Sequence, residues 1–286
     1  MILITGANGH LGSATIDFLL KKNPNVKIKA LVRSKEKGKK LKNERIEFAV
    51  GDYLDYGSLV NAMKDVETLL LVSSSTIGGR YSQHANAIKA AKQAGVKHIV
   101  YTSVLKGSPG SKFTAANDHV KTENDLKSSG INYTIMRNTY YADFLPDIIG
   151  NAIESGAIYY SAGNAKINFA ARMDMAEANA VVLSDITNHQ NKIYEITSGR
   201  AYTFTDIAEM LSSITGKEIK YTDVPIEALK ENIVKAGMPN EVAELMASIA
   251  ESMKVGEFDY CDTALEKLLG RKPVDLKEFL KGVYQK

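Results

Sequence analysis

The chain has 286 residues, of which 44% are apolar and 24% are charged, and its formal net charge is +3. This composition excludes disordered and fibrous proteins and predicts a globular protein with one large domain or two lobes. A net charge of +3 is too small for a nucleic-acid-binding surface, so we expect no nucleic-acid partner. The single cysteine, Cys261, rules out an internal disulfide and a thiolate metal cluster, which fits a reducing compartment.

We expect neither a targeting peptide nor a membrane segment. Met1 begins an apolar strand pattern, without the basic segment and cleavage-like site of a signal peptide. Apolar stretches stay well below the roughly 20 residues that a membrane-spanning helix needs. We therefore predict a cytoplasmic protein with no membrane partner.

The first twelve residues, MILITGANGHLG, predict a buried strand, a glycine-rich turn and the start of a helix. Gly6 suits the tight bend, Gly9 allows the backbone to approach a pyrophosphate, and Gly12 allows the helix to pack closely on the strand. The helix N-terminus adds free N–H groups and a positive dipole. A turn without a ligand is the alternative, since this glycine spacing is one residue longer than in many dehydrogenases. The candidate cofactor-binding residues of the turn are Gly6, Asn8, Gly9, His10, Leu11 and Gly12.

Through the first half of the chain, apolar strands alternate with amphipathic helices at the spacing of βαβ units. This pattern predicts an α/β fold with a doubly wound parallel sheet, whose ligands bind beyond the carboxyl ends of the strands. Gly95 and Gly130 are predicted helix stops. The predicted strands are Met1–Thr5, Val26–Val32, Ile46–Val50, Thr68–Val72, His98–Ser103 and Tyr133–Arg137. The predicted helices are His10–Lys22, Lys35–Lys42, Tyr56–Met63, Gln83–Ala94 and Asp118–Ser128.

After residue 137 the alternation loosens. We expect residues 1–137 to form a nucleotide-binding core, and residues 138–286 a smaller substrate-binding lobe that shares elements with it. The expected elements there are a strand at Lys192–Thr197 and helices at Phe144–Ser155, Phe204–Thr215, Ile226–Ala236, Glu241–Lys254 and Leu276–Tyr284.

The residues that follow the second strand favour NADPH over NADH, although NADH stays an alternative. An enzyme that prefers NAD usually has Asp or Glu there to accept from the ribose 2′-OH, whereas this chain has Arg33. Its guanidinium can pair with a 2′-phosphate in a bidentate manner, with Lys37 as a helper. The alternative is that the basic run from Arg33 to Lys42 is a solvated face.

Polar residues also follow the next strands. Asp52 and Tyr53 follow the third strand, where the adenine would lie. Asp52 either accepts a hydrogen bond from the exocyclic amine of the adenine or caps a helix. Small hydroxylated residues follow the fourth and fifth strands and are candidates to border the nicotinamide and its ribose, although loop chemistry explains them almost as well. These residues are Ser73, Ser74, Ser75 and Ser103.

On these motifs the chain resembles the NmrA-like atypical short-chain dehydrogenases, and within them the type-2 NAD(P)H:quinone oxidoreductases. Triarylmethane-dye reductases are also similar. The resemblance covers nearly the whole chain and implies a Rossmann-type fold. It is carried by Thr5–Gly12, Val32–Arg33, Gly51–Tyr53, Leu70–Ser75, Gln83–His84, Ala90–Val96, Tyr101–Ser103 and Arg137–Asn138.

One departure from ordinary short-chain dehydrogenases bears on mechanism. Those enzymes carry Tyr-x-x-x-Lys on the helix after the fifth strand, whereas this chain has His119 and Glu123. His119 is a candidate proton donor oriented by Glu123, and a structural His–Glu pair is the alternative. Asn138 and Tyr141 are further candidates for the reaction centre, with anchoring of the second lobe as the alternative. Tyr140, Tyr141 and Phe144 either stack on a flat acceptor or pack between the lobes.

We predict an NADPH-dependent oxidoreductase that transfers hydride to a quinone-like acceptor. A quinone tolerates the missing tyrosine acid, because hydride transfer yields a stabilised hydroquinone anion, and a cationic dye needs no proton at all. The alternatives are a triarylmethane-dye reductase and a redox sensor that binds NADP(H) without turnover. A homodimer is allowed for. No His, Asp and Glu cluster has metal-ligand spacing, so no metal is expected.

Overall fold

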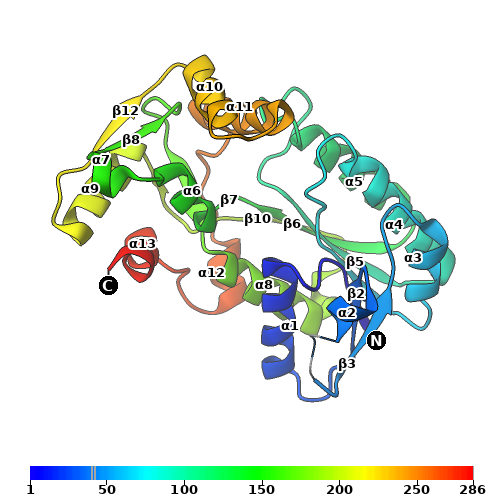
Figure 1. Cartoon of the computed structure of the whole chain (residues 1–286). Helices are drawn as coiled ribbons and strands as arrows, with labels where there is room; N and C mark the ends of the chain where they lie inside the picture. The colour runs from blue at the N-terminus through cyan, green and yellow to red at the C-terminus, as the bar shows by residue number, and fades with distance from the viewer. Residues whose placement is uncertain (40, 42, 286) are drawn as a thin grey trace. The chain divides into compact units, whose positions relative to one another are not determined.

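The computed structural model describes residues 1–39, 41 and 43–285 (Figure 1). Their contacts divide the chain into two compact units. Unit 1 comprises Met1–Val104, Asp118–Arg137 and Arg172–Tyr194, and unit 2 comprises Leu105–Asn117, Asn138–Ala171 and Glu195–Lys286. The chain therefore passes between the units at several points, and not only after residue 137.

Unit 1 is built on a seven-stranded sheet with the strand order β3-β2-β1-β4-β5-β6-β10. The pairs from β3 across to β5 are parallel. This order confirms the predicted Rossmann-type doubly wound fold. The strand predicted at Lys192–Thr197 in the second lobe is β10, which forms the seventh strand of this sheet. The strands are β1 (Ile2–Ile4), β2 (Ile28–Val32), β3 (Ile46–Val50), β4 (Thr68–Leu71), β5 (His98–Val104), β6 (Asn132–Asn138) and β10 (Lys192–Ile196).

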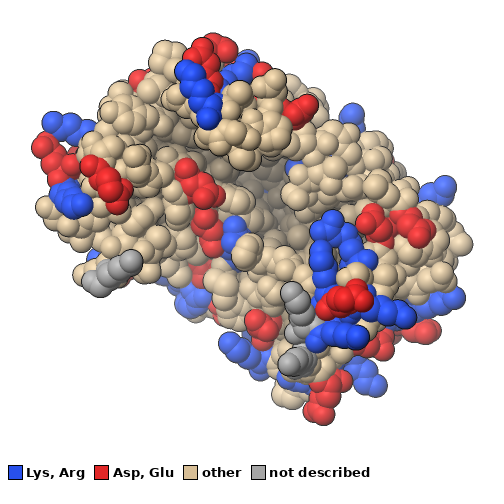
Figure 2. All heavy atoms as spheres, viewed as in Figure 1, with Lys and Arg blue, Asp and Glu red and all other residues tan. Residues whose placement is uncertain are grey.

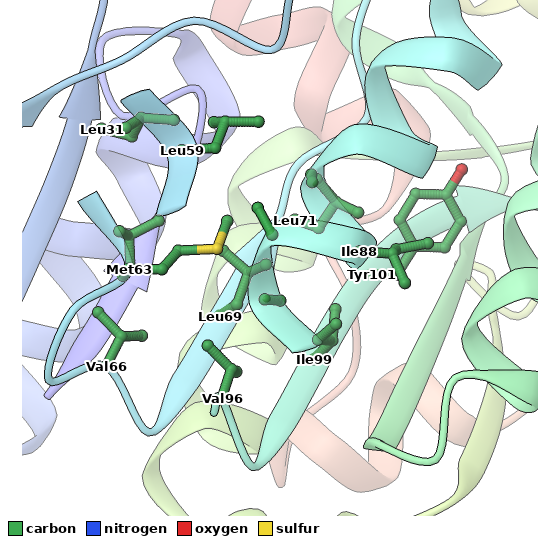
Figure 3. Packing of buried hydrophobic residues seen from close by; sticks show 14 of the residues in the cluster. Leu31, Leu59, Met63, Val66, Leu69, Leu71, Ile88, Val96, Ile99 and Tyr101 are labelled. Carbon is green, nitrogen blue, oxygen red and sulfur yellow. The ribbon is translucent and has the colours of Figure 1, made fainter. Parts of the chain in front are cut away.

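Helices cover both faces of the sheet (Figure 1). On one face, α3 (Tyr56–Ala62), α4 (Arg80–Ala94) and α5 (Ala116–Ser128) pack on alternate strand residues such as Leu69 and Ile99. Figure 3 shows this core, with Tyr101 at its edge and the tyrosine hydroxyl pointing away from the other labelled side chains. On the other face, α1 (His10–Lys22) packs along α8 (Arg172–Ser184).

Unit 2 contains two small sheets, with the strand orders β11-β9-β7 and β12-β8. Its strands are β7 (Tyr140–Tyr141), β8 (Ala157–Tyr160), β9 (Ile167–Ala170), β11 (Ala201–Tyr202) and β12 (Lys220–Asp223). Its helices are α6 (Leu145–Ile149), α7 (Ala152–Ser155), α9 (Phe204–Thr215), α10 (Ile226–Lys235), α11 (Asn240–Lys254), α12 (Ala264–Leu269) and α13 (Leu276–Tyr284). No helix in the described part of the chain is long and apolar enough to cross a membrane.

The helix predicted at Gln83–Ala94 begins three residues earlier, at Arg80, and two other predicted helices differ more from the structure. The helix expected at Lys35–Lys42 is α2 (Lys35–Gly38), and residues 40 and 42 lie outside the described residues. Gly38 packs on the ring of Phe48, where a Cβ atom would approach ring carbons to 2.4 Å. The helix expected at Phe144–Ser155 is divided into a 3₁₀ turn (Ala142–Phe144), α6 and α7, because Gly150 takes a positive φ of 55°.

We predict that Leu69→Ala lowers the free energy of unfolding by about 2–5 kcal/mol, because Leu69 is fully buried in the core of unit 1 and its truncation leaves a cavity. Urea unfolding followed by circular dichroism measures the change. Leu54→Ala is the matched control, since Leu54 is 70% exposed, and it should change the free energy by less than about 0.5 kcal/mol. Equal effects of the two substitutions would contradict the packing described here.

Candidate functional site

The glycine-rich turn between β1 and α1 is packed so closely that side chains are excluded from it. Gly6 has a φ of +59°, and the N–H of Gly9 donates to the carbonyl oxygen of Gly6 at 2.8 Å. A Cβ atom on Gly12 would lie 2.3 Å from that same oxygen. Glycine at position 12 therefore allows α1 to begin directly against the bend.

The N-terminus of α1 is open to an anion. Its N-cap is Gly9, which has no side chain to accept from the first N–H groups, and its first turn contains no acidic residue. Asn8, Gly9 and His10 are exposed, whereas Leu11 and Gly12 are buried and offer only their backbone. Free N–H groups and the positive end of the helix dipole together suit a diphosphate, so these residues fit the dinucleotide that the sequence predicts.

The loop after β4 lies beside the glycine turn. The N–H of Val72 donates to Thr5 Oγ1 at 2.8 Å, and a Cβ atom on Gly6 would lie 3.3 Å from Val72 Cβ. The hydroxyl of Tyr53 donates to the carbonyl of Val72 at 2.9 Å, and burial raises the pKa of this phenol so that it keeps its proton. The strand order reverses between β1 and β4, and this is the point where doubly wound sheets bind ligands.

Three side chains of α4 hold Ser74. The Nε of Arg80 donates to the carbonyl of Ser74 at 2.6 Å, and the N–H of Ser74 donates to His84 Nε2 at 2.9 Å. The hydroxyl of Ser74 donates to Gln83 Oε1. One residue earlier, the N–H of Ser73 donates to Thr102 Oγ1 at 2.9 Å. The serine loop is thus fixed through its backbone, and Ser75 is left exposed.

Sequence reasoning missed Arg80 and Gln83 and assigned no role to His84. All three are buried, at 9%, 7% and 0% exposure. A signal was present, because these residues lie at positions i, i+3 and i+4 of a helix and so form one polar stripe. The other buried residues of this helix are mainly alanine, so such a stripe indicates that the helix forms hydrogen bonds on the side that faces the sheet.

At the end of β2, Arg33 is exposed and has no acceptor among the residues that the structure describes. Ser34 caps α2 by accepting from the N–H of Lys37, whose ammonium side chain is also exposed. Figure 2 shows Lys and Arg side chains gathered over this part of unit 1. A basic end of β2 is what recognition of a 2′-phosphate requires.

Asp52 does not cap α3, so that alternative is wrong. The cap is Asp55, whose Oδ1 accepts from the N–H of Ser58 at 3.0 Å. Asp52 instead makes a local turn, because its Oδ1 accepts from the N–H of Leu54 at 2.9 Å. Its carboxylate is half-buried.

Glu123 does not orient His119, so the predicted His–Glu pair is wrong. Glu123 is buried and pairs with Arg137, whose Nε and Nη2 lie 2.8 and 2.6 Å from its two carboxylate oxygens. The hydroxyl of Ser103 also donates to Glu123, at 2.8 Å. Since the proton of Ser103 is used in this bond, Ser103 Oγ could only accept a hydrogen bond from a cofactor. Burial raises the pKa of Glu123, but the hydrogen bonds and charge of Arg137 outweigh burial and lower it. The carboxylate is therefore ionised and fully engaged.

His119 takes a different partner. Its Nδ1 lies 2.7 Å from the hydroxyl of Tyr101, which is also 3.3 Å from Nδ1 of His84. Burial, together with the charge of Arg80, lowers the pKa of His84 to about 3 and that of His119 well below its usual value. Both imidazoles are therefore neutral at pH 7.

In unit 2 the structure brings together Asn138 and Tyr141. The Nδ2 of Asn138 donates to the hydroxyl of Tyr141 at 3.1 Å, and the ring of Tyr141 stacks on Phe144 at an interplanar angle of 1°. The buried Oδ1 of Asn138 has no hydrogen-bond partner in the described residues. Tyr140 instead packs against Phe169 and Phe258, as an aromatic of the core does.

The comparisons with known proteins agree with this geometry. A family model described as the NmrA-like family matches residues 1–280. The chain belongs to the NmrA-like family. Quinone oxidoreductase 2 of Escherichia coli is 38% identical over 285 residues, which are 99% of each chain. The family predicted from the motifs is confirmed.

Solved structures of relatives carry the cofactor that the site fits. The NADPH-dependent quinone oxidoreductase of Escherichia coli, complexed with NADPH, superimposes with a TM-score of 0.94 at 36% identity, covering 99% of this chain and 100% of that one. The Citrobacter sp. triphenylmethane reductase complexed with NADP(H) gives a TM-score of 0.93 at 37% identity, covering 99% of both chains.

Within this NmrA-like chain, no group of three or more potential metal ligands gathers among the residues that are described.

We predict that Gly12→Ala weakens NADPH binding at least about 10-fold, a loss of roughly 1.4 kcal/mol, because the new methyl group displaces α1 from the carbonyl of Gly6. Isothermal titration with NADPH measures the effect. Gly282→Ala is the control, since Gly282 is exposed in α13 and a Cβ atom there meets no neighbour within 4 Å. The control should leave the affinity unchanged, and unaltered binding by the position-12 variant would refute the assigned role.

Proposed function

We propose that this protein is an NADPH-dependent oxidoreductase that transfers hydride to a quinone-like acceptor. The observation that carries the proposal is the glycine turn, in which an uncapped helix N-terminus meets the ends of β1 and β4. The relatives with solved structures, a quinone oxidoreductase and a triphenylmethane reductase, support both the cofactor and the class of small-molecule acceptor.

The chain's own residues divide the binding of NADPH between them. The turn from Gly6 to Gly12 binds the diphosphate through backbone N–H groups. Arg33, with Lys37 beside it, binds the 2′-phosphate, while Asp52 and Tyr53 lie toward the adenine. The loop from Ser73 to Ser75 and the end of β5 at Ser103 border the nicotinamide ribose. When bound, the cofactor supplies the hydride.

A quinone suits the remaining chemistry of the site. Helix α5 carries no Tyr-x-x-x-Lys pair, so the proton donor that ketone reduction requires is missing. Reduction of a quinone yields a hydroquinone anion, which takes its proton from water, so the protein has chiefly to orient the two reactants. Asn138 and Tyr141 remain our candidates for contact with the acceptor, because Asn138 keeps a free buried acceptor atom and Tyr141 presents a stacked aromatic pair.

Two finer predictions from the sequence are retained. The cytoplasmic location stays a prediction that the single cysteine supports, and the homodimer also stays a prediction. A dye reductase is the second candidate function, favoured by the 37% identity to the triphenylmethane reductase.

We predict that Arg33→Asp weakens NADPH binding about 10- to 100-fold and leaves NADH binding nearly unchanged, since it removes charge-assisted hydrogen bonds worth roughly 1.5–3 kcal/mol. Titration with both cofactors measures the difference. Lys27→Asp makes the same charge change at the opposite, amino end of β2, where Lys27 is exposed, and should affect neither cofactor. Equal weakening of NADPH and NADH by the position-33 variant would remove the case for 2′-phosphate recognition.

The proposed activity predicts steady NADPH oxidation when the purified protein is mixed with a benzoquinone, followed as loss of dihydronicotinamide absorbance. Aldehydes should give no turnover, because they need the missing proton donor. Tight NADPH binding without turnover over a panel of quinones, dyes and aldehydes would instead establish the redox sensor and overturn the proposed enzyme.

A further inference from the structure

The hydrogen bonds around His84 and His119 can be assigned a direction, starting from a group that can only donate. The N–H of Ser74 can only donate, so His84 Nε2, 2.9 Å away, must accept. A neutral imidazole carries its one proton on the other nitrogen, so His84 is protonated at Nδ1. That proton points at Thr122 Oγ1, 3.0 Å away.

Thr122 cannot reverse this direction. Its own hydroxyl proton is committed to the carbonyl of Asp118 at 2.7 Å, so its oxygen is left to accept from His84. The proton on His84 Nδ1 also lies toward the hydroxyl oxygen of Tyr101, at the longer distance of 3.3 Å. Because His84 Nδ1 is a donor, it cannot accept from Tyr101, and the close acceptor for the proton of Tyr101 is Nδ1 of His119, at 2.7 Å.

This chain of bonds decides the tautomer of His119. Since Nδ1 accepts from Tyr101, the neutral ring carries its proton on Nε2. Among the described residues Nε2 has no hydrogen-bond partner, and it is not sealed from solvent, because His119 retains 7% exposure and this atom is not among the buried unpaired ones. His119 thus presents one N–H donor away from the core.

The position of this donor matches the edge of the sheet where ligands bind. His119 lies in the first turn of α5, the helix that follows β5, and Tyr101 lies in the middle of β5, paired with Leu71 at the carboxyl end of β4. The ring of Tyr101 is fully buried in the apolar core of unit 1, and its hydroxyl points out of that core (Figure 3). The charged groups around the two imidazoles are Arg80 and Asp118, whose Nη1 and Oδ2 lie 3.9 Å apart.

We propose that His119 acts as a neutral hydrogen-bond donor to the oxyanion of the reduced acceptor, and that Tyr101 and His84 are positioning residues that hold it in the required tautomer. The inference rests on the proposed function. Hydride from the reduced cofactor forms the new O–H bond with one carbonyl oxygen of the quinone, and the π electron pair of that carbonyl moves into the ring. The second carbonyl oxygen becomes the anion, receives the hydrogen bond of His119 Nε2–H, and is later protonated by water. His119 itself neither gains nor loses a proton.

The first test needs no turnover. Imidazole ¹⁵N spectra of the cofactor-free protein at pH 7 should show His84 protonated at Nδ1 and His119 protonated at Nε2. Tyr101→Phe keeps the packing of the ring and removes the hydroxyl, so His119 should then populate both tautomers. His119 protonated at Nδ1 in the unaltered protein, or a spectrum unchanged by Tyr101→Phe, would overturn the chain of bonds.

The second test separates oxyanion stabilisation from general damage. We predict that His119→Ala lowers kcat by about 10²–10³-fold, with NADPH affinity unchanged, and that Tyr101→Phe gives a smaller loss in the same direction. The loss should be larger with tetramethyl-benzoquinone than with dichloro-benzoquinone, whose hydroquinone anion is intrinsically more stable and needs less help.

His98→Gln is the matched control. His98 is a buried histidine at the amino end of β5, and its Nε2 contacts Thr134 Oγ1 at 2.8 Å, whose own proton goes to the carbonyl of His189 at 2.7 Å. Its substitution should leave kcat and its dependence on the quinone unchanged. Equal losses with both quinones, or a loss shared by His98→Gln, would overturn the proposal. If no quinone is reduced at all, the proposed function fails, whereas the ¹⁵N spectra still decide the tautomers.

Discussion

The contact between Gly12 and the carbonyl oxygen of Gly6 is the constraint on which the cofactor site depends. Only a hydrogen atom fits there, since a Cβ atom would come within 2.3 Å of the oxygen. Because of that closeness, α1 starts at the bend itself, and its unpaired N–H groups face the carboxyl end of β1. The neighbouring loop at Val72 is then placed through Thr5, so the turn that we propose for the diphosphate and the loop that we propose for the ribose belong to one backbone arrangement.

A second constraint is that polar groups buried at this edge of the sheet must be paired. Ser74 illustrates it, since its N–H, carbonyl and hydroxyl are each held by a different side chain of α4. The same requirement directs donation from Ser74 to His84, from His84 to Thr122, and from Tyr101 to His119. His119 Nε2 has no hydrogen-bond partner among the described residues, and it is this donor that we assign to the reaction.

The sequence predicted those features that lie within one continuous segment. The glycine turn and the helix at His10–Lys22 were predicted to the residue, because strand, turn and helix signals follow one another directly. Helix α8 was not predicted, since it is buried on most sides and shows no clear apolar stripe, with Asp174 and Asn179 among its buried residues. The strands β7 and β8, of two and four residues, were not predicted either. The partner of His119 was wrong for another reason: an i, i+4 spacing predicted Glu123, whereas Arg137 from β6 offers that carboxylate two charged hydrogen bonds.

Ordinary short-chain dehydrogenases carry Tyr and Lys on this helix, whereas α5 carries His119 and Glu123. This difference changes the electrostatics of the helix as well as its chemistry. A lysine near a tyrosine lowers the pKa of the phenol and makes it a usable acid, whereas here the negative charge of Glu123 is taken up by Arg137. Burial, together with the positive charge of Arg80, lowers the pKa of His119 and so keeps the imidazole neutral. A neutral imidazole is a poor proton donor and a good hydrogen-bond donor. The site is therefore matched to acceptors whose reduced anion needs stabilisation but no proton during hydride transfer, and quinones are acceptors of this kind.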